Sequence, residues 1–444
     1  MNHRPVASRP RHCMVVHAYY PLHEPRVSRE AEALVRAGYD VDVVCLRDAG
    51  EPARERHQGV DVHRLPVRID KRSLGHQFLS YANFLSHATV HVGREHLRRP
   101  YQSVQVHNLP DFLVFSAAVP KFTGTPVLLD LHDLMPEFFA GRFGSGPLRP
   151  LAALVRAQER LSCRFADHVI TVSDAWRERL VERGVPAARC SVVMNVADDR
   201  VFTPRTRRPE SAPGFRLIYH GQLTHRYGLD LAVRAVAALR DEIPDIHLTI
   251  HGRGDAVEEL AALVAELQLE HVVALSTDSV PAEALPDMIA EADLGVVPYR
   301  DDVFTDGIVP TKLMEYAAVG IPCVAARTSA ISTYFTDTMT ELFEPGNVDD
   351  LVAKIRALHA DRARLDRLAD GSRRFMARYR WAEVRAQYVQ LVREQGRRAA
   401  TATDPSPDPS ITSSPRDTPA APRSPLRDPR PDRTRTSVGA STVH

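Results

Sequence analysis

A cation and a carboxylate stand three residues apart in GIVPTKLMEYAAVGIPCVA, which runs from residue 307 to 325. Pro310 suits the first position of a helix, where its missing N–H costs nothing. Lys312 would then lie near the positive end of the helix dipole, where a cation gains no stability. A bound anion would supply that stability, and the Glu315 carboxylate could accept hydrogen bonds from two hydroxyl groups. A phosphate and a ribose would suit these two side chains. The alternative is a surface ion pair between them, which would contribute about 0.2–0.5 kcal/mol.

A second stretch, YHGQLTHRYGLDLA, has the residue types of a phosphate-binding turn. A strand ends at Gly221, which permits a tight turn, and a helix begins near Gly228 or Leu229. The free N–H groups and the positive dipole end of such a helix suit a phosphate group. Arg226 could bridge a diphosphate, and Gln222 could add hydrogen bonds. An ordinary strand-to-helix turn with a surface arginine would fit the spacing equally well.

Three other places put polar or small residues at the ends of expected strands. In VLLDLHDLMPE, His132 and Asp133 follow an apolar strand, and in VHNLPD, His107 and Asn108 follow another. A histidine there could bind or position a sugar. In IHGRGD, Gly252 could let the backbone approach a ligand closely, although Gly-x-Gly alone is frequent in α/β proteins. Taken singly, each of these residues more often serves a local turn.

Short apolar strands alternate with amphipathic helices along most of the chain. CMVVHAYY, VDVVCL, YQSVQVH, PVLLDLH and ADHVITVS read as strands, with helices such as VSREAEALVRAGYD between them. The polar, proline-rich stretch 198–214 interrupts this pattern, which restarts with FRLIYHG. We therefore expect two Rossmann-like, doubly wound α/β domains that face one interdomain cleft. Ligands bind at the carboxyl ends of the strands in such sheets, where the residues above are expected to lie.

Composition and charge exclude several classes of function. The chain has 444 residues, a formal net charge of +1 and five scattered cysteines without a CxxC pair. The charge balance argues against general nucleic-acid binding, and the cysteines indicate neither a zinc site nor a disulfide framework. The sequence shows no signal-type segment and no apolar run that could span a bilayer, so we expect a soluble, cytoplasmic protein.

Together these stretches resemble the retaining glycosyltransferases of family 4, which have the GT-B fold. The resemblance runs from residue 13 to about 392, and PTKLMEYAAVGIPCVA is its most specific part. It implies that the C-terminal domain binds a nucleotide-diphosphate sugar and that the N-terminal domain binds the acceptor. The expected N-terminal domain covers 1–205, the C-terminal domain 206–375, a helix returning to the N-terminal domain 376–398, and a disordered Pro/Ser/Thr/Arg-rich tail 399–444.

The resemblance also assigns roles to individual residues. Glu315 matches the glutamate that holds the ribose hydroxyls, the loop 221–228 matches the phosphate-binding loop, and His132 matches a histidine close to the transferred sugar. The expected donor-binding residues are Gly221, Gln222, Arg226, Gly252, Asp306, Thr311, Lys312 and Glu315. The expected acceptor-side residues are Arg26, His107, Asn108 and Asp133, and the expected catalytic residues are His132, Arg226 and Lys312.

The phosphate loop differs from the family's pattern at two positions. Gln222 stands where the family often has an arginine, and Tyr227 stands where it often has a lysine. Arg226 is then the cation that remains in the loop, and Lys312 could supply a second one. We expect these cations and the helix N-termini to stabilise the leaving diphosphate, so that no metal or cofactor is needed.

A third difference concerns a second glutamate that the family often has eight residues before the ribose glutamate. Gly307 occupies that position, and Asp306 beside it could contact the hydroxyl groups of the donor sugar. The resemblance implies retention of the anomeric configuration. Retention need not involve a protein nucleophile, since the leaving phosphate itself can deprotonate the acceptor.

The acceptor stays open between a glycan, a lipid-linked molecule and a small molecule. The stretch 70–100 mixes apolar and basic residues and could lie on an anionic membrane, which would suit a lipid-linked acceptor, cell-envelope polysaccharide biosynthesis and a place at the inner face of the cell membrane. A helix packed on its own sheet is the alternative. Two other functions also remain open: a nucleotide-sugar epimerase, which shares this architecture, and a non-catalytic sugar-nucleotide-binding subunit.

Overall fold

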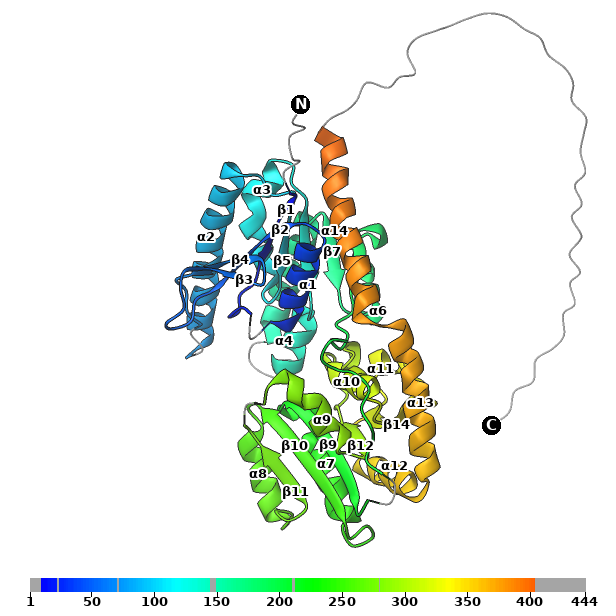
Figure 1. The fold of residues 1–444 in the computed structure, drawn as a ribbon. Coiled ribbons are helices and arrows are strands. Elements are labelled where there is room, and N and C mark those ends of the chain that lie inside the picture. Colours follow the sequence, from blue (N-terminus) through cyan, green and yellow to red (C-terminus); the bar gives the residue numbers. More distant parts are fainter. Residues whose placement is uncertain are drawn as a thin grey trace, which may run out of the picture. The chain divides into compact units, whose positions relative to one another are not determined.

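The computed structural model of the protein describes residues 9–21, 24–69, 72–143, 149–209, 212–278 and 280–403 (Figure 1). Within these residues two parallel sheets follow one another along the chain, as the alternation of strands and helices predicts. The expected tail lies outside the described residues from 404 onward. None of the helices in the described residues combines the length and the apolar character needed to cross a bilayer.

The first sheet has eight strands in the described residues, in the order β3-β4-β2-β1-β5-β6-β7-β8. Its strands are β1 (Arg11–Val15), β2 (Asp40–Leu46), β3 (Arg54–His57), β4 (Val60–Leu65), β5 (Ser103–His107), β6 (Val127–Leu131), β7 (His168–Thr171) and β8 (Cys190–Val192). All pairings are parallel except that of β3 with β4. Sequence reasoning missed this hairpin because β3 reads RERH and has no apolar alternation.

The second sheet has six strands in the described residues, all parallel, in the order β11-β10-β9-β12-β13-β14. Its strands are β9 (Phe215–Gln222), β10 (Ile246–Arg253), β11 (Val273–Ser276), β12 (Leu294–Val297), β13 (Cys323–Ala326) and β14 (Glu341–Phe343). The central strand β9 ends at the turn that was expected to bind phosphate.

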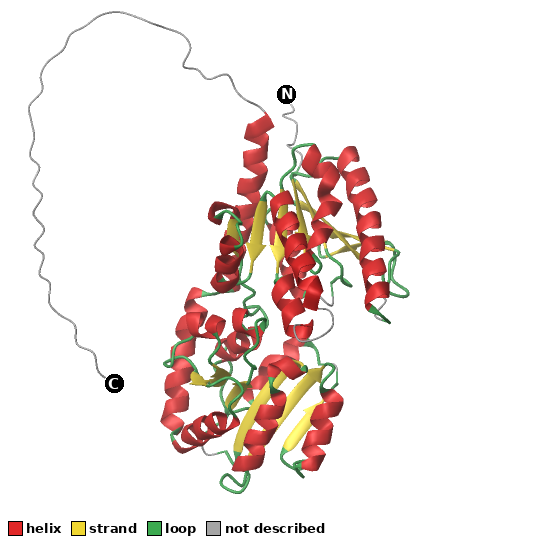
Figure 2. Ribbon diagram, turned by 180° about the vertical axis from the view of Figure 1, so that it is seen from behind, coloured by secondary structure: helices red, strands yellow, loops and turns green. Residues whose placement is uncertain are grey.

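Helices cover both faces of each sheet, as Figure 2 shows in red against the yellow strands. Those of the first sheet are α1 (Pro25–Arg36), α2 (Leu74–Arg98), α3 (Ala118–Phe122), α4 (Met135–Phe143), α5 (Ala152–Phe165) and α6 (Asp174–Glu182). Those that follow are α7 (Leu229–Leu239), α8 (Val257–Glu266), α9 (Leu285–Ala290), α10 (Thr311–Val319), α11 (Ser329–Tyr334), α12 (Val348–Ala360), α13 (Arg362–Arg378) and α14 (Trp381–Thr403).

The period of the strands explains why helices are needed on both faces. Met14 of β1 packs in one apolar cluster with Val27 of α1, whereas its neighbour Val15 packs in a second cluster with Phe84 of α2. Successive side chains of a strand point to opposite faces, so a strand that is apolar throughout requires cover on both sides. The last helix, α14, reaches this sheet, where Tyr388 donates a hydrogen bond to Gln105 of β5 over 2.7 Å.

Candidate active site

Lys312 is a buried cation at the start of α10, with its side chain only 8% exposed. Its ammonium lies 5.1 Å from the centre of the Tyr219 ring and 5.2 Å from that of Tyr227. The Tyr227 ring is stacked in turn on Tyr299, with 4.4 Å between ring centres. No hydrogen bond or ion pair to another described residue satisfies the ammonium. Burial lowers the pKa of Lys312 to about 8, although the Glu315 carboxylate opposes the shift.

Glu315 lies one helical turn further along α10 and is held by a histidine. Its Oε2 is 2.6 Å from Nε2 of His220, the residue before Gly221 at the end of β9. Burial alone would raise the pKa of Glu315, but the hydrogen bond and charge of His220, with the charges of Lys312 and Arg29, bring it below its ordinary value. The carboxylate is therefore ionised at neutral pH and can accept hydrogen bonds. We call Tyr219, Gly221, Tyr227, Lys312 and Glu315 the lysine site.

The glycines at the ends of β9 and β10 are required by packing. Gly221 has φ +111°, and a Cβ atom there would lie 2.7 Å from Cε of Lys312. A Cβ atom on Gly252, which has φ +152°, would lie 1.7 Å from the carbonyl oxygen of Gly221. Gly252 was expected to let the backbone approach a ligand, but the close approach that the structure shows is between the two strands. Gly221 by contrast makes the room that the Lys312 side chain occupies.

Arg226 packs against aromatic side chains. Its guanidinium packs over two rings, 4.8 Å from the centre of Phe304 and 5.5 Å from that of Phe138 in α4. Its Nη1 atom is buried and has no hydrogen-bond partner. The charge of Arg226 also lowers the pKa of Asp133, although burial raises that pKa by more. The structure therefore places Arg226 beside the strand end of the N-terminal domain that carries His132 and Asp133.

A second cluster of charges surrounds Asp130, the last-but-one residue of β6. Arg26 contacts both carboxylate oxygens over 3.1 Å, through Nε and Nη2. Asp130 Oδ2 is also 3.2 Å from Nδ1 of His107 and 3.4 Å from Nε2 of His132. The two histidines are 3.1 Å apart between these nitrogens. We call Arg26, His107, Asp130 and His132 the histidine site.

The charges of the histidine site stabilise one another. Burial alone would raise the pKa of Asp130, but Arg26 and His132 hold it well below its ordinary value. Burial alone would lower the pKa of His132, but the Asp130 carboxylate raises it by more, so the net shift is upward. His132 keeps its side chain 20% exposed, and its Nε2 is directed inward. Of this site's residues, His132 is therefore the one that can present an atom to a substrate.

The remaining acceptor-side residues are structural supports. His107 is fully buried. Nη1 of Arg26 donates a hydrogen bond to the carbonyl oxygen of Val193 over 2.8 Å. Asn108 donates to the carbonyl oxygen of Asp133 and accepts from the backbone N–H of His132 over 2.9 Å. These contacts fix the strand ends that carry His132, so the structure shows Arg26, His107 and Asn108 in contact with protein groups that support this histidine.

Comparison with known families decides the class of enzyme to which these two sites belong. The family described as Glycosyl transferase 4-like domain matches residues 23–196, and the family described as Glycosyl transferases group 1 matches residues 205–375. The chain is a family 4 glycosyltransferase. The sulfoquinovosyl transferase of Arabidopsis thaliana is 26% identical over 285 residues, which cover 61% of this chain and 52% of that relative. The chain thus spans about half the length of this relative.

Solved structures show that the glycosyltransferase has the GT-B fold that its sequence predicts. The sucrose-phosphate synthase of Thermosynechococcus elongatus matches with a TM-score of 0.70 and 20% identity, over 87% of this chain and 99% of that one. HepE of Anabaena, solved in complex with UDP-glucose, matches with a TM-score of 0.64 and 16% identity, over 86% and 99% of the two chains.

The structure gives a physical reason for the missing second glutamate of this glycosyltransferase. A Cβ atom on Gly307 would lie 2.4 Å from the ring of Trp176, so no side chain fits there. The carbonyl oxygen of Gly307 accepts a hydrogen bond from Ser173 over 3.1 Å. The Asp306 carboxylate beside it is bound by Arg179 at 3.2 Å and by the backbone N–H of Ser329 at 2.7 Å.

His107, Asp130 and His132 also have the ligand types of a metal site, with their donor atoms within 4.8 Å of one another. However, both oxygens of Asp130 already face the guanidinium of Arg26. A divalent cation at this place would be repelled by that buried positive charge. The arrangement is therefore better suited to sharing protons between the histidines and the carboxylate than to holding a metal.

Sequence reasoning did not assign Tyr219 and Asp130 to a site, nor His220 and Gln105, which hydrogen-bond to Glu315 and Asp130. His220 could have been found, because it directly precedes Gly221 at the carboxyl end of an apolar strand. Asp130 also carries a signal, because an acidic residue inside the apolar strand VLLDL requires a buried partner. Tyr219 and Gln105 carry no such signal, because their roles depend on contacts with distant parts of the chain.

Proposed function

We propose that this glycosyltransferase moves a sugar, with retention of configuration, from a nucleotide-diphosphate sugar to an acceptor. The observation that carries the proposal is the lysine site: a largely buried lysine whose ammonium has no hydrogen-bond partner among the described residues, one helical turn from an ionised carboxylate. A diphosphate would supply the counter-charge that Lys312 lacks, and the two hydroxyl groups of a ribose would fit the acceptor oxygens of Glu315. The likeness in fold to a HepE protein solved with UDP-glucose supports a donor of this class.

Lys312 stabilises the leaving group in this reaction. Glycosyl transfer places developing negative charge on the diphosphate as its bond to the sugar breaks. A cation that is already desolvated and fixed in position interacts with such charge much more strongly than one in water. Since the pKa of Lys312 is about 8, the side chain is mostly protonated at neutral pH, and a bound diphosphate would raise that pKa further. The first N–H groups of α10 add to the same field.

His132 positions the sugar or the acceptor from the other side. Its inward Nε2 faces Asp130 and His107, and its raised pKa favours the protonated ring. A protonated ring donates hydrogen bonds from both nitrogens, so Nδ1 would donate to a substrate oxygen. Arg226 lies close enough to Asp133 to influence its pKa and would act on the substrate from the same side. The leaving phosphate takes the proton of the acceptor hydroxyl.

We further propose that the reaction needs no metal ion, because Lys312, Arg226 and the N-terminus of α10 already supply positive charge for the diphosphate. The acceptor is a glycan, a lipid-linked molecule or a small molecule, in a setting of cell-envelope polysaccharide biosynthesis. We place the protein in the cytoplasm, with peripheral contact at the inner face of the cell membrane. The α2 stretch that suggested this contact packs Phe84, Ala88 and Val92 into the core.

A ligand screen followed by a transfer assay tests this proposal. Nucleotide-diphosphate sugars are first ranked by the rise in melting temperature of the full chain, since a ligand that binds the native state raises apparent stability. The best donor is then incubated with candidate acceptors in EDTA, and the anomeric configuration of the product is read by NMR. Stabilisation by a donor and an α-configured product from an α-configured donor are expected. An epimerised donor without transfer, or binding without any product, would replace the proposal by one of the two other functions.

A further inference from the structure

A cavity of about 580 Å³ lies outside both catalytic clusters, between α5 and the segment 183–189. Positive charge dominates its lining, which includes Arg156, Arg160, Arg164, Arg183 and Arg189 against the single carboxylate of Glu159. Cys163, Val185 and Pro186 give the cavity an apolar part. We call it the arginine pocket.

The arginines of this pocket differ in how they are compensated. Arg183 binds Glu137 and Glu159, and Arg189 donates to the carbonyl oxygens of residues 166 and 167. Arg156, Arg160 and Arg164, by contrast, are exposed on α5 and form no hydrogen bond or ion pair with any described residue. They follow one another at intervals of four residues. Like charges at this spacing repel each other on a helix, and an anion bound along the row would relieve that repulsion.

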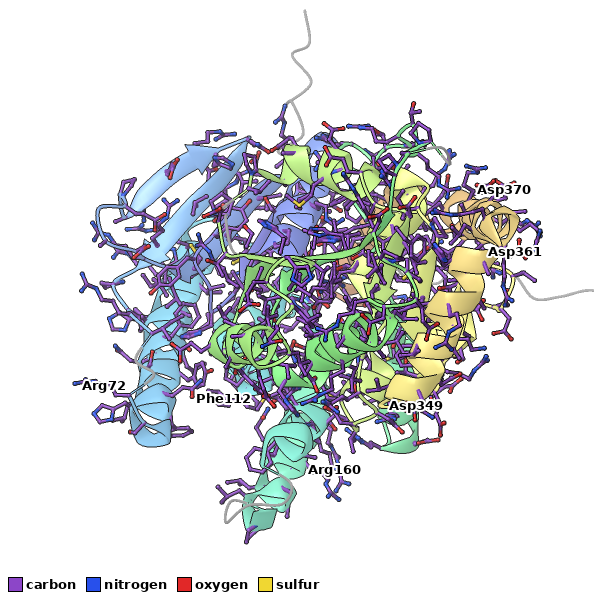
Figure 3. The ribbon with its side chains drawn as sticks, turned by 90° about the horizontal axis from the view of Figure 1, so that it is seen from below. Arg72, Phe112, Arg160, Asp349, Asp361 and Asp370 are labelled. Carbon is purple, nitrogen blue, oxygen red and sulfur yellow. The ribbon has the colours of Figure 1, made fainter. Side chains whose placement is uncertain are left out.

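The same helix exposes apolar side chains next to the basic row. Leu154 is 66% exposed and Leu161 is 60% exposed, although both are large and aliphatic. Their positions differ by seven residues, about two helical turns, which places them on one face of the helix. Figure 3 shows Arg160 at the margin of the molecule, where its helix projects past the surrounding ribbons. The exposed surface of α5 thus has an apolar strip beside a basic strip.

We propose that α5 and the arginine pocket form a docking site for anionic phospholipids at a membrane surface. The phosphate of a lipid headgroup would accept charge-assisted hydrogen bonds from Arg156, Arg160 and Arg164, and the two leucines would enter the boundary between headgroups and acyl chains. A soluble phosphate would account for the arginines but not for the exposed leucines, whereas an anionic lipid accounts for both strips. The inference extends the proposed membrane contact and is independent of the transfer chemistry at the lysine and histidine sites.

α2 lies in the stretch 70–100, for which the sequence left open a membrane contact or packing on its own sheet, and it lacks the basic pocket of α5. It exposes more large apolar side chains than α5 does, namely Phe78 (61%), Leu79 (66%), Val90 (71%) and Leu97 (70%). Arg98 at its end is already paired with Glu95 at 3.1 Å. No cavity lined by several unpaired cations adjoins it in the described residues, whereas α5 has one. α2 therefore provides a matched control for α5 with two leucines of nearly equal exposure.

Co-sedimentation of the full chain with vesicles tests the docking site. Wild-type protein is expected to bind phosphatidylcholine vesicles that contain phosphatidylglycerol, to bind pure phosphatidylcholine weakly, and to be released by salt. The variant Arg156→Gln/Arg160→Gln/Arg164→Gln should bind roughly a hundred-fold more weakly, from about five-fold for each charge near an anionic surface. The variant Leu154→Ser/Leu161→Ser should bind about ten-fold more weakly.

Two controls match these variants. Arg234→Gln/Arg374→Gln/Arg378→Gln removes three exposed arginines from α7 and α13, and Leu79→Ser/Leu97→Ser removes two exposed leucines from α2; neither should weaken binding more than about two-fold. The proposal is overturned if removing the distant arginines weakens vesicle binding as much as removing those of α5. It is also overturned if the α2 variant weakens vesicle binding and the α5 variants do not. So does the absence of binding to anionic vesicles at low salt.

Soluble glycerol phosphate distinguishes a lipid from a free phosphate. If it raises the melting temperature of wild type but not of the triple arginine variant, while vesicles do not bind, then the pocket binds a soluble phosphate and the membrane proposal is wrong. Donor-induced stabilisation should be the same in wild type and in the α5 variants. If no nucleotide-diphosphate sugar stabilises the wild-type protein, that result counts against the proposed function and does not affect the docking site.

Discussion

The lysine site and the histidine site hold their buried charges in opposite ways. Lys312 has aromatic rings around it and no hydrogen-bond partner in the described part of the chain, whereas Asp130 faces one arginine and two histidines within 3.4 Å. A buried charge without a partner is costly, and a fully paired one can be kept at less cost. Under the proposed function, a ligand would supply the partner that the first site lacks, whereas the charges of the second site are already paired within the fold around His132.

The largest expected effect comes from removing the unpaired cation. Lys312→Met should lower kcat by about 10²- to 10³-fold, because a preorganised charge on the leaving group is lost. The same variant should increase the free energy of unfolding, by on the order of 1–3 kcal/mol, because an uncompensated buried charge is replaced by an apolar side chain. Steady-state kinetics and denaturant titration measure the two effects.

A surface lysine provides the control for this variant. Lys354 of α12 is paired with Glu341 at 3.3 Å, and Lys354→Met should leave kcat within about two-fold and should not stabilise the fold. If Lys312→Met lost stability as well as activity, the lysine would be a structural element, and the contrast between the two sites would disappear.

The paired site should respond in the opposite direction. Asp130→Asn removes the carboxylate that compensates Arg26 and should lower the free energy of unfolding by about 3–5 kcal/mol. Asp370, an exposed residue of α13, is the control, and Asp370→Asn should change stability by less than about 0.5 kcal/mol. Urea titrations with a shared slope decide the comparison. A stability near wild type for Asp130→Asn would show that the pairing contributes little to the fold.

A smaller effect is expected at the carboxylate of the lysine site. Glu315→Gln keeps the shape of the side chain but loses the charge, so its hydrogen bonds to two hydroxyl groups weaken by about 1.5–3 kcal/mol, or roughly ten- to a hundred-fold in the Kd of the donor nucleotide. Calorimetry with a nucleoside diphosphate measures this change. The corresponding 2′,3′-dideoxynucleotide should bind wild type and variant alike. If the dideoxynucleotide instead bound Glu315→Gln more weakly than it bound wild type, Glu315 would not act by binding the ribose.

The smallest effect is a pH dependence that belongs to the lysine site. Because the pKa of Lys312 is about 8 in the fold, donor affinity should fall about ten-fold between pH 7 and pH 9 and stay flat in Lys312→Met. The stability effect has the opposite sign. Between about pH 8 and the ordinary lysine pKa of 10.5, the unfolded chain binds more protons, so this group makes the fold more stable as pH rises. Calorimetric titrations over this range test both signs.

The fold and the residues of the lysine site could largely be inferred from sequence, because their signals are local. The proline before Thr311 places Lys312 and Glu315 at the start of a helix. The glycine after Tyr219 and His220 marks the end of an apolar strand. The partners could not be inferred, because they come from other elements. His220 reaches Glu315 from β9, and nothing in the spacing of either stretch states that the two will meet at 2.6 Å.

Two expected site residues have partners that their place in the sequence does not show. Asp306 contacts Arg179 and Ser329, and Gly252 lies against Gly221; these partners lie on other elements. A pattern along the chain identifies which residues sit at a strand end. It does not show whether their polar atoms are already occupied.

The sequence by itself therefore determined the two α/β domains, the family and the strand ends that carry the chemistry. Hydrophobic periodicity and turn residues act over a few positions, and these are readable without a structure. Which charged side chains are buried without a hydrogen-bonded partner follows from the tertiary structure, as at Lys312 in the described part of the C-terminal domain. Whether a charge has a partner depends on contacts between distant segments, and burial in the folded chain is what makes a missing partner costly.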